Sequence, residues 1–362
     1  MYFLHDDPRL SAAWGPWFAH EYLNYFTALA TPWLADLPPV PVRPCPGLET
    51  LGLNGWPLGP EHRDIYKEEY RLVRQVEGDE AYDYSYRNGE YATRVPEGTT
   101  IPPWQILVLY ATEPDLMLDC DLELHWTQRF TGGSHGLRHM QFRAWGLNIG
   151  RAARSLHLHR QAARRAFELG YEYWGWRYLS RATHYLADLG HPFHVKVAPW
   201  TELVSFPWAA HRLFRRFSAI HQAYEMYAET RFRDGFVPFQ EALVRGAQAG
   251  GDPDGPSLDA ELRDYMARTA GSLDYIYRFL KNNFGPALEA VFTRMDEHPE
   301  LDTAKQTMLC SADTVRVLFR PGGPDLAPLD QVTANILTEV GRMLGRLYAE
   351  EQNRLKSLLT PR

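Results

Sequence analysis

His184 and Asp188 stand four residues apart in the segment ATHYLADLGHPFHV, which has the apolar spacing of an α-helix. Two side chains at this spacing lie on one face of a helix, one turn apart. Gly190 and Pro192 end the helix, so the chain turns immediately before His194. An imidazole, a carboxylate and a second imidazole therefore converge at one helix end. This set suits Zn²⁺, although a hydrogen-bonded His–Asp pair has the same spacing.

A second helical pattern, SAIHQAYEMY, contains His221 and Glu225 at the same four-residue spacing. The pair offers another two-ligand face to a metal ion. Taken alone, it is more typical of a solvated His–Glu contact. Together with the first motif, it favours a metal site built from two helical segments.

Histidine and aspartate are also dense upstream, in the glycine-containing segment EPDLMLDCDLELHWTQRFTGGSHGLRHMQF. Its members are Asp115, Asp119, Asp121, His125, His135 and His139. Each of them would need a polar partner if it were buried, so packing does not explain their density. Any one could make an ordinary polar contact, but the group as a whole indicates metal coordination.

The segment HYLADLGHPFH, residues 184–194, resembles the signature of the zinc-dependent phospholipase C family. In that family, H-Y-x-G-D-x-x-x-P-x-H supplies ligands to a trinuclear zinc site. The same superfamily includes the fungal single-strand-specific nucleases, which share the site and the helical fold. The resemblance extends over residues 14–20 and 108–230. It implies an all-α fold and two or three bound Zn²⁺ ions.

The resemblance assigns a role to each residue of the two helical motifs. His184 matches the family's first histidine, and Asp188 matches the carboxylate that bridges two metals. His194 matches the histidine that begins the second metal's ligand set. His221 and Glu225 match the H-x-x-x-E pair that completes that set.

The upstream cluster is assigned in the same way. LYATEPD resembles the segment in which the family places a metal-bridging Asp, so Asp115 takes that role. RHMQF resembles the His-aromatic segment that follows, so His139 takes the role of the fourth ligand of the first metal. The two are 24 residues apart, farther than in the family. The alternatives are therefore His125 or His135 for the histidine and Asp119 or Asp121 for the aspartate.

The third metal of the family is held partly by an N-terminal Trp, freed by signal cleavage, and by a nearby His. WGPWFAH, residues 14–20, resembles this start, so His20 is carried over as a ligand, with Trp14 as the matching aromatic residue. The chain begins with Met1, so the Trp amine chelate requires removal of residues 1–13. Without that removal, the third position has His20 and Asp188 alone.

The ligand set predicts a metal-dependent phosphodiester hydrolase. Divalent ions clamp the oxygens of a phosphodiester and lower the pKa of a water toward neutrality. Asp115 would bridge two ions or act as the general base. No nucleophilic Ser or Cys is required by this chemistry, and no G-x-S-x-G motif occurs.

Glu225 favours a phospholipase C-like activity, because the phospholipase branch has Glu in the H-x-x-x-E pair and the nuclease branch has Asp. A phospholipid or other phosphodiester substrate is expected, and a lipid substrate implies transient contact with a membrane surface. One alternative is a single-strand nuclease or nucleotidase with the same site. Another is a non-catalytic helical protein whose structural metals have four protein ligands each. Head group and oligomeric state stay open.

Composition excludes several classes of protein. A net charge of −7 and a pI near 6.1 argue against binding duplex nucleic acid. Cys45, Cys120 and Cys310 are too few and too scattered for a disulfide framework or a thiolate zinc site. No signal peptide or membrane-spanning run is evident, which slightly favours the cytoplasm, although the resembled family is mostly secreted.

The elements that must position these residues are helices. We expect one all-α domain over residues 1–362, with long loops, a loop-rich insertion at 36–100 and additional C-terminal helices in 236–362. Helical patterns cover the following residues: 1–35, 61–76, 104–112, 151–189, 207–230, 257–282, 285–295 and 328–358. Residues 79–97 form a hairpin or a loop, and GDPDGP at 251–256 is a break.

Overall fold

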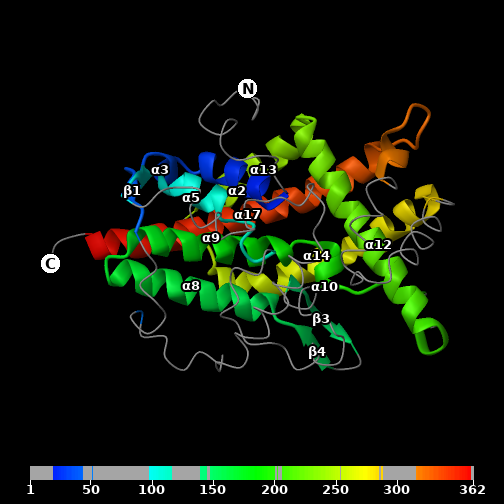
Figure 1. Ribbon diagram of the computed structural model, residues 1–362, viewed down its shortest axis with the longest axis horizontal. Coiled ribbons are helices and arrows are strands. Elements are labelled where there is room, and N and C mark those ends of the chain that lie inside the picture. The colour runs from blue at the N-terminus through cyan, green and yellow to red at the C-terminus, as the bar shows by residue number, and fades with distance from the viewer. Residues whose placement is uncertain are drawn as a thin grey trace.

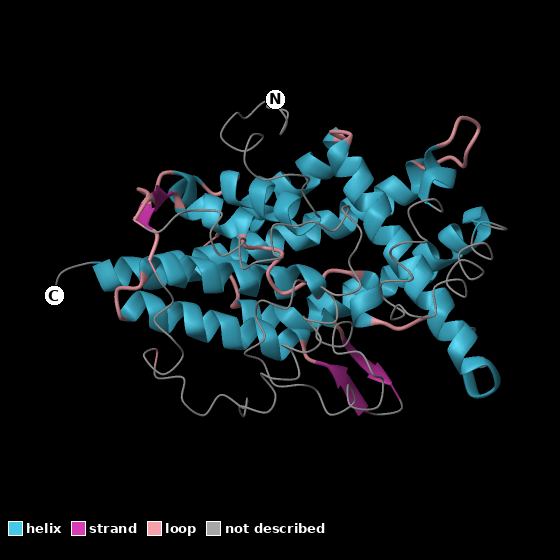
Figure 2. Cartoon of the chain, in the orientation of Figure 1, coloured by secondary structure: helices cyan, strands magenta, loops and turns pink. Residues whose placement is uncertain are grey.

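The computed structural model describes residues 19–43, 51, 98–115, 139–144, 147–199, 202, 206–252, 254–284, 287 and 315–359. Helices make up 74% of the described residues, whose sheets are two short antiparallel pairs. Figure 2 shows that helices dominate the described chain. The expectation of an all-α protein is confirmed.

The run predicted at 151–189 forms two antiparallel helices, α8 (Ala152–Glu168) and α9 (Glu172–Asp188). The turn between them contains Gly170, whose positive φ of 79° is accessible to glycine without strain. In α9, all residues from Tyr173 onward are buried, because α2, α5, α8 and α17 pack around it (Figure 1). The candidate ligands His184 and Asp188 lie in the last turns of this buried helix.

One side of α9 is covered by the N-terminal helices. They are α2 (Ala19–Leu29), α3 (Pro32–Ala35) and α5 (Pro103–Leu109), with strands β1 (Val40–Pro41) and β2 (Thr100–Ile101) paired at their edge. The buried Asn24 amide joins the layers, because it donates to the Leu107 carbonyl at 2.8 Å and to the Thr183 hydroxyl at 2.9 Å. This contact holds α2, and with it His20, against α9.

The remaining elements are strands β3 (Gln141–Ala144) and β4 (Leu147–Gly150) and helices α10 (Pro192–Val195), α12 (Phe206–Arg233), α13 (Val237–Gly250), α14 (Leu258–Phe284) and α17 (Ala327–Leu359). Helix α10 contacts both α14 and β3. The end of α9 therefore meets segments that are far apart in the sequence (Figure 1).

Helices α13 and α17 pack unusually closely through glycines at four-residue spacing. A Cβ atom on Gly246 or Gly250 would overlap backbone atoms of α17, and one on Gly341 or Gly345 would overlap backbone atoms of α13. The side-chain-free surfaces therefore let the two backbones touch. Since α17 also packs against α9, this contact supports the central helix.

We predict that Gly250→Ala destabilises the protein by about 1–3 kcal/mol, because the added methyl group collides with the Arg342 carbonyl and the helices must separate. Gly271→Ala in α14 is the control, since a Cβ there meets nothing within 4 Å. It should stabilise the helix by about 0.5–1 kcal/mol. Urea unfolding of both variants measures the difference, and equal effects would contradict the close-packing explanation.

Most predicted helices agree with the structure. Helices α12, α14 and α17 occupy the runs predicted at 207–230, 257–282 and 328–358. The elements that were not among the predicted patterns are α10, α13 and the strand pairs β1–β2 and β3–β4. Residues 61–76, 79–97 and all of 285–295 except 287 lie outside the described residues, as does most of the predicted insertion at 36–100.

The division of the chain into one domain with an insertion and additional helices stays a prediction. Among the helices that the structure describes, none is both long enough and apolar enough to cross a membrane.

Candidate metal centre

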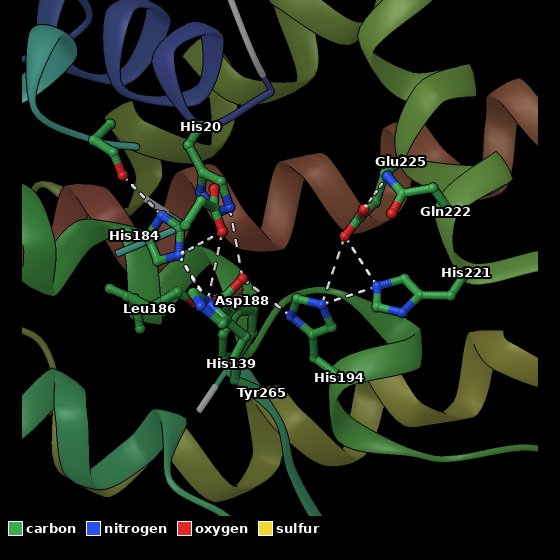
Figure 3. Close-up of polar contacts among 12 residues, drawn as sticks. His20, His139, His184, Leu186, Asp188, His194, His221, Gln222, Glu225 and Tyr265 are labelled. Carbon is green, nitrogen blue, oxygen red and sulfur yellow. Dashed lines mark hydrogen bonds and ion pairs between the residues drawn. The ribbon is translucent and has the colours of Figure 1, made fainter. Parts of the chain in front are cut away.

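All eight side chains predicted as ligands lie in described residues, and the structure brings them together around the end of α9. Figure 3 labels seven of them, all except Asp115. They are His20, Asp115, His139, His184, Asp188, His194, His221 and Glu225. They come from α2, the turn after α5, the residues before β3, α9, α10 and α12. Their ligand atoms fall into groups within 4.8 Å of one another, as coordination of shared ions requires.

Asp188, the last residue of α9, lies at the centre of the cluster and is almost fully buried. Its Oδ2 atom lies 2.8 Å from Nδ1 of His139 and 3.2 Å from Nε2 of His184. Its Oδ1 atom lies 3.0 Å from Nδ1 of His194 and 3.5 Å from Nε2 of His20. Each carboxylate oxygen therefore faces two imidazoles, an arrangement that suits a carboxylate shared between ions.

His184 is held in one orientation by the backbone. Its Nδ1 atom lies 2.7 Å from the Ala111 carbonyl, to which it donates a hydrogen bond. This bond leaves Nε2 as the nitrogen that faces Asp188 (Figure 3). The ring also stacks on His20, with centroids 3.8 Å apart. Outer hydrogen bonds of this kind are typical of metal-ligating histidines.

We define the first set as Asp115, His139, His184 and Asp188. Nε2 of His184 lies 2.9 Å from Nδ1 of His139, and Oδ1 of Asp115 lies 3.6 Å and 3.8 Å from those two nitrogens. Tetrahedral zinc with bonds of about 2.0–2.1 Å places its ligand atoms about 3.3 Å apart. The separations in the first set bracket that value, so these residues fit a zinc-sized ion.

The second set is His194, His221 and Glu225. Nε2 of His221 lies 3.0 Å from Nε2 of His194 and 2.9 Å from Oε1 of Glu225, and the His194–Glu225 separation is 3.6 Å. These atoms also fit a tetrahedral ion. His194 joins the two sets, because its Nδ1 faces Asp188 while its Nε2 faces Glu225 (Figure 3).

Asp115 is placed by a buried ion cluster two residues before it. The Glu113 carboxylate is fully buried and accepts hydrogen bonds from the guanidinium groups of Arg177 and Arg181 on α9. Burial alone would raise the pKa of Glu113, but the two cations hold it below its ordinary value. The cluster fastens the turn after α5 to α9, so Asp115 reaches His184.

His194 is placed by a tight turn between α9 and α10. A Cβ atom on Gly190 would overlap the Tyr265 hydroxyl and a Val340 methyl group, so the turn requires glycine. The His194 amide donates to the His191 carbonyl at 3.0 Å, and the His191 amide donates to the Asp188 carbonyl at 2.9 Å. The turn therefore returns the chain directly onto Asp188.

The charges of the cluster follow from its contacts. Burial alone would raise the pKa of Asp188 and of Glu225, but neighbouring histidines, chiefly His184 and His221 respectively, hold both values well below the ordinary range. Burial alone would lower the pKa of His194, but the two carboxylates raise it to about 10. Both carboxylates are thus ionised, and a divalent ion must displace a proton from His194.

The structure also shows what sequence reasoning missed. His191 belongs to a group with the second set, although it was not predicted as a ligand. Its three-residue spacing to His194 was the available signal. The alternative ligands His125, His135, Asp119 and Asp121, and the aromatic residue Trp14, lie outside the described residues. Asp115 and His139 are the members of the upstream cluster that the structure places in the centre.

Searches for known proteins do not add to this description. No protein family, curated protein or solved structure matches the chain. What the geometry shows is a helical protein with clusters of His, Asp and Glu that could hold metal ions.

Proposed function

We propose that the protein is a metal-dependent phosphodiester hydrolase of the phospholipase C type, with two or three Zn²⁺ ions. The observation that carries the proposal is that the first and second sets of ligands lie side by side. Asp188 of the first set contacts His194 of the second set at 3.0 Å. Ions in adjoining sets act together on a phosphodiester, by activating water and neutralising charge on phosphate oxygens. The resemblance of residues 184–194 to the zinc-dependent phospholipase C signature supports the same proposal.

Asp115 is the group best placed to act on a substrate. Its side chain is 42% exposed, whereas those of His184 and Asp188 are 0% and 1% exposed. An exposed carboxylate at the edge of a buried cluster can accept the proton of an attacking water. Asp115 therefore serves as the general base or as the bridging ligand that meets solvent.

His20 marks a third, incomplete position. Its Nε2 atom faces Oδ1 of Asp188 at 3.5 Å, and its Nδ1 atom is buried without a hydrogen-bond partner in the described residues. His184 does not supply a ligand at this position. Its Nδ1 atom is hydrogen-bonded to the Ala111 carbonyl, so Nε2 is its one ligand atom, and Nε2 belongs to the first set. An ion beside His20 thus has two ligands from described residues and is weakly held. Activity should therefore rise with Zn²⁺ beyond two equivalents.

A lipid is the favoured substrate. Glu225 stands where the nuclease branch of the resembled superfamily has Asp. The net charge of −7 disfavours a polyanionic substrate, and three scattered cysteines cannot form the disulfides of that branch. We therefore expect phosphatidylcholine-like lipids to be cleaved on the diacylglycerol side.

The experiment is a parallel assay on protein purified without chelator, after elemental analysis has shown its metal content. We predict at least two zinc-like ions per chain. We also predict hydrolysis of a short-chain phosphatidylcholine to diacylglycerol that is abolished by chelator and restored by Zn²⁺. A single-stranded oligonucleotide is tested under the same conditions and should be cleaved more slowly.

The other outcomes separate the competing functions. Faster, chelator-sensitive cleavage of the oligonucleotide would indicate a nuclease with the same metal centre. If protein that holds its metals cleaves neither substrate, the metals are structural and the enzyme proposal is wrong. Less than one ion per chain, unchanged on zinc titration, would contradict the metal centre itself.

A further inference from the structure

His191 lies in the turn between α9 and α10, beside the second set. Its ring centroid is 4.5 Å from that of His194 and 4.9 Å from that of His221. One of its ring nitrogens lies within 4.8 Å of the ligand atoms of all three members of the second set. The residue is therefore placed as a neighbour of every ligand in that set.

The ring nitrogens of His191 are not engaged by any side chain or backbone group that the structure describes. Both ring nitrogens are buried, and neither has a hydrogen-bond partner among the described residues. The hydroxyl of adjacent Tyr224 lies 3.2 Å from the hydroxyl of Thr333 and so is engaged elsewhere. The His191 imidazole therefore has a ring nitrogen that can face a cation held by the second set.

We propose that His191 is a fourth protein ligand of the ion held by His194, His221 and Glu225, an inference that rests on the proposed metal centre. A separation of up to 4.8 Å exceeds the roughly 3.3 Å of tetrahedral zinc ligands, so the His191 ring moves inward when the ion binds. Backbone bonds of residue 191 to Asp188 and His194 keep the turn in place while the side chain rotates.

With His191 as a fourth ligand, the ion of the second set has a different role from the other ions. Zinc with four protein ligands has no open tetrahedral position and is retained, whereas catalytic zinc keeps a position for water or substrate. The second ion therefore supplies charge and holds α10 against α12. A position for water or substrate is left at the incomplete third site, where His20 and Asp188 are the ligands from described residues.

The test compares His191→Gln with the wild-type full chain, and His157→Gln serves as the matched control. His157 lies on α8 with a side chain that is 46% exposed and contacts Asp259 rather than the metal centre. Zinc affinity is measured by competition with a chromophoric chelator, and Co²⁺ titration reports geometry, because four-coordinate Co²⁺ absorbs visible light more strongly than five- or six-coordinate Co²⁺. Far-UV circular dichroism verifies that each variant is folded.

We expect the wild type and His157→Gln to retain a tightly held ion with a four-coordinate cobalt spectrum. His191→Gln should hold that ion about 100-fold more weakly, since loss of even an outer partner costs 10–100-fold. Its cobalt absorption should weaken. If His191→Gln does not fold, His191→Ala is tested in its place. Added imidazole should replace the missing side chain and restore the ion and its cobalt spectrum.

Unchanged affinity and spectrum in His191→Gln would overturn the role of His191 and leave the metal centre intact. Failure of imidazole to restore the ion in folded His191→Ala would count against it in the same way. A wild-type protein that binds neither Zn²⁺ nor Co²⁺ would overturn both this inference and the proposed function.

Discussion

Asp188→Asn is expected to reduce bound metal below one ion per chain and to lower phosphodiesterase activity by more than about 100-fold. Oδ1 and Oδ2 of Asp188 together face four imidazoles at 2.8–3.5 Å. Asparagine removes the negative charge and replaces one oxygen by a donor that cannot ligate. Because one carboxylate serves both sets, a single substitution weakens both ions.

Glu225→Gln is the comparison for this prediction, since Glu225 belongs to the second set and does not touch the first. It should lose about one ion and retain the other. Elemental analysis of both variants, with circular dichroism to show that they are folded, gives the result. Greater metal loss in Glu225→Gln than in Asp188→Asn would show that Asp188 is not shared.

Glu113→Gln is expected to destabilise the protein by about 3–5 kcal/mol. Glu113 is fully buried, and its carboxylate pairs with both Arg177 and Arg181, which are also buried. The glutamine amide removes the negative charge that Glu113 provides to both guanidinium groups in the interior, where each is poorly solvated. Asp115 should also be displaced from His184, so metal content should fall before the protein unfolds.

Glu168→Gln is the matched control, because Glu168 also pairs with two arginines, Arg165 and Arg354, but at the surface. Its side chain is 30% exposed and those of its partners are 44% and 41% exposed, so the loss should be below about 1 kcal/mol. Urea unfolding at fixed zinc concentration compares the two. A similar small loss in Glu113→Gln would mean that the buried cluster is not needed for stability.

Local sequence spacing was enough to predict which ligand pairs lie on the same face of a helix. His184 with Asp188 and His221 with Glu225 are four residues apart in strong helical patterns, and helix geometry alone makes each pair adjacent. Gly190 and Pro192 likewise predicted that the chain turns back before His194, as it does. The helices α8, α9, α12, α14 and α17 were predictable for the same reason, because hydrophobic periodicity is local.

Only the tertiary structure decided how these local pairs combine. Asp115 and His139 are 24 residues apart with several equivalent candidates between them, and the turn fastened by Glu113 and the start of β3 bring these two to α9. His191 was not predicted as a ligand because its three-residue spacing to His194 falls in a turn, where spacing alone does not show which side chains meet. Its neighbours His221 and Tyr224 come from α12. Contacts between distant segments depend on how helices pack, which helical periodicity does not specify.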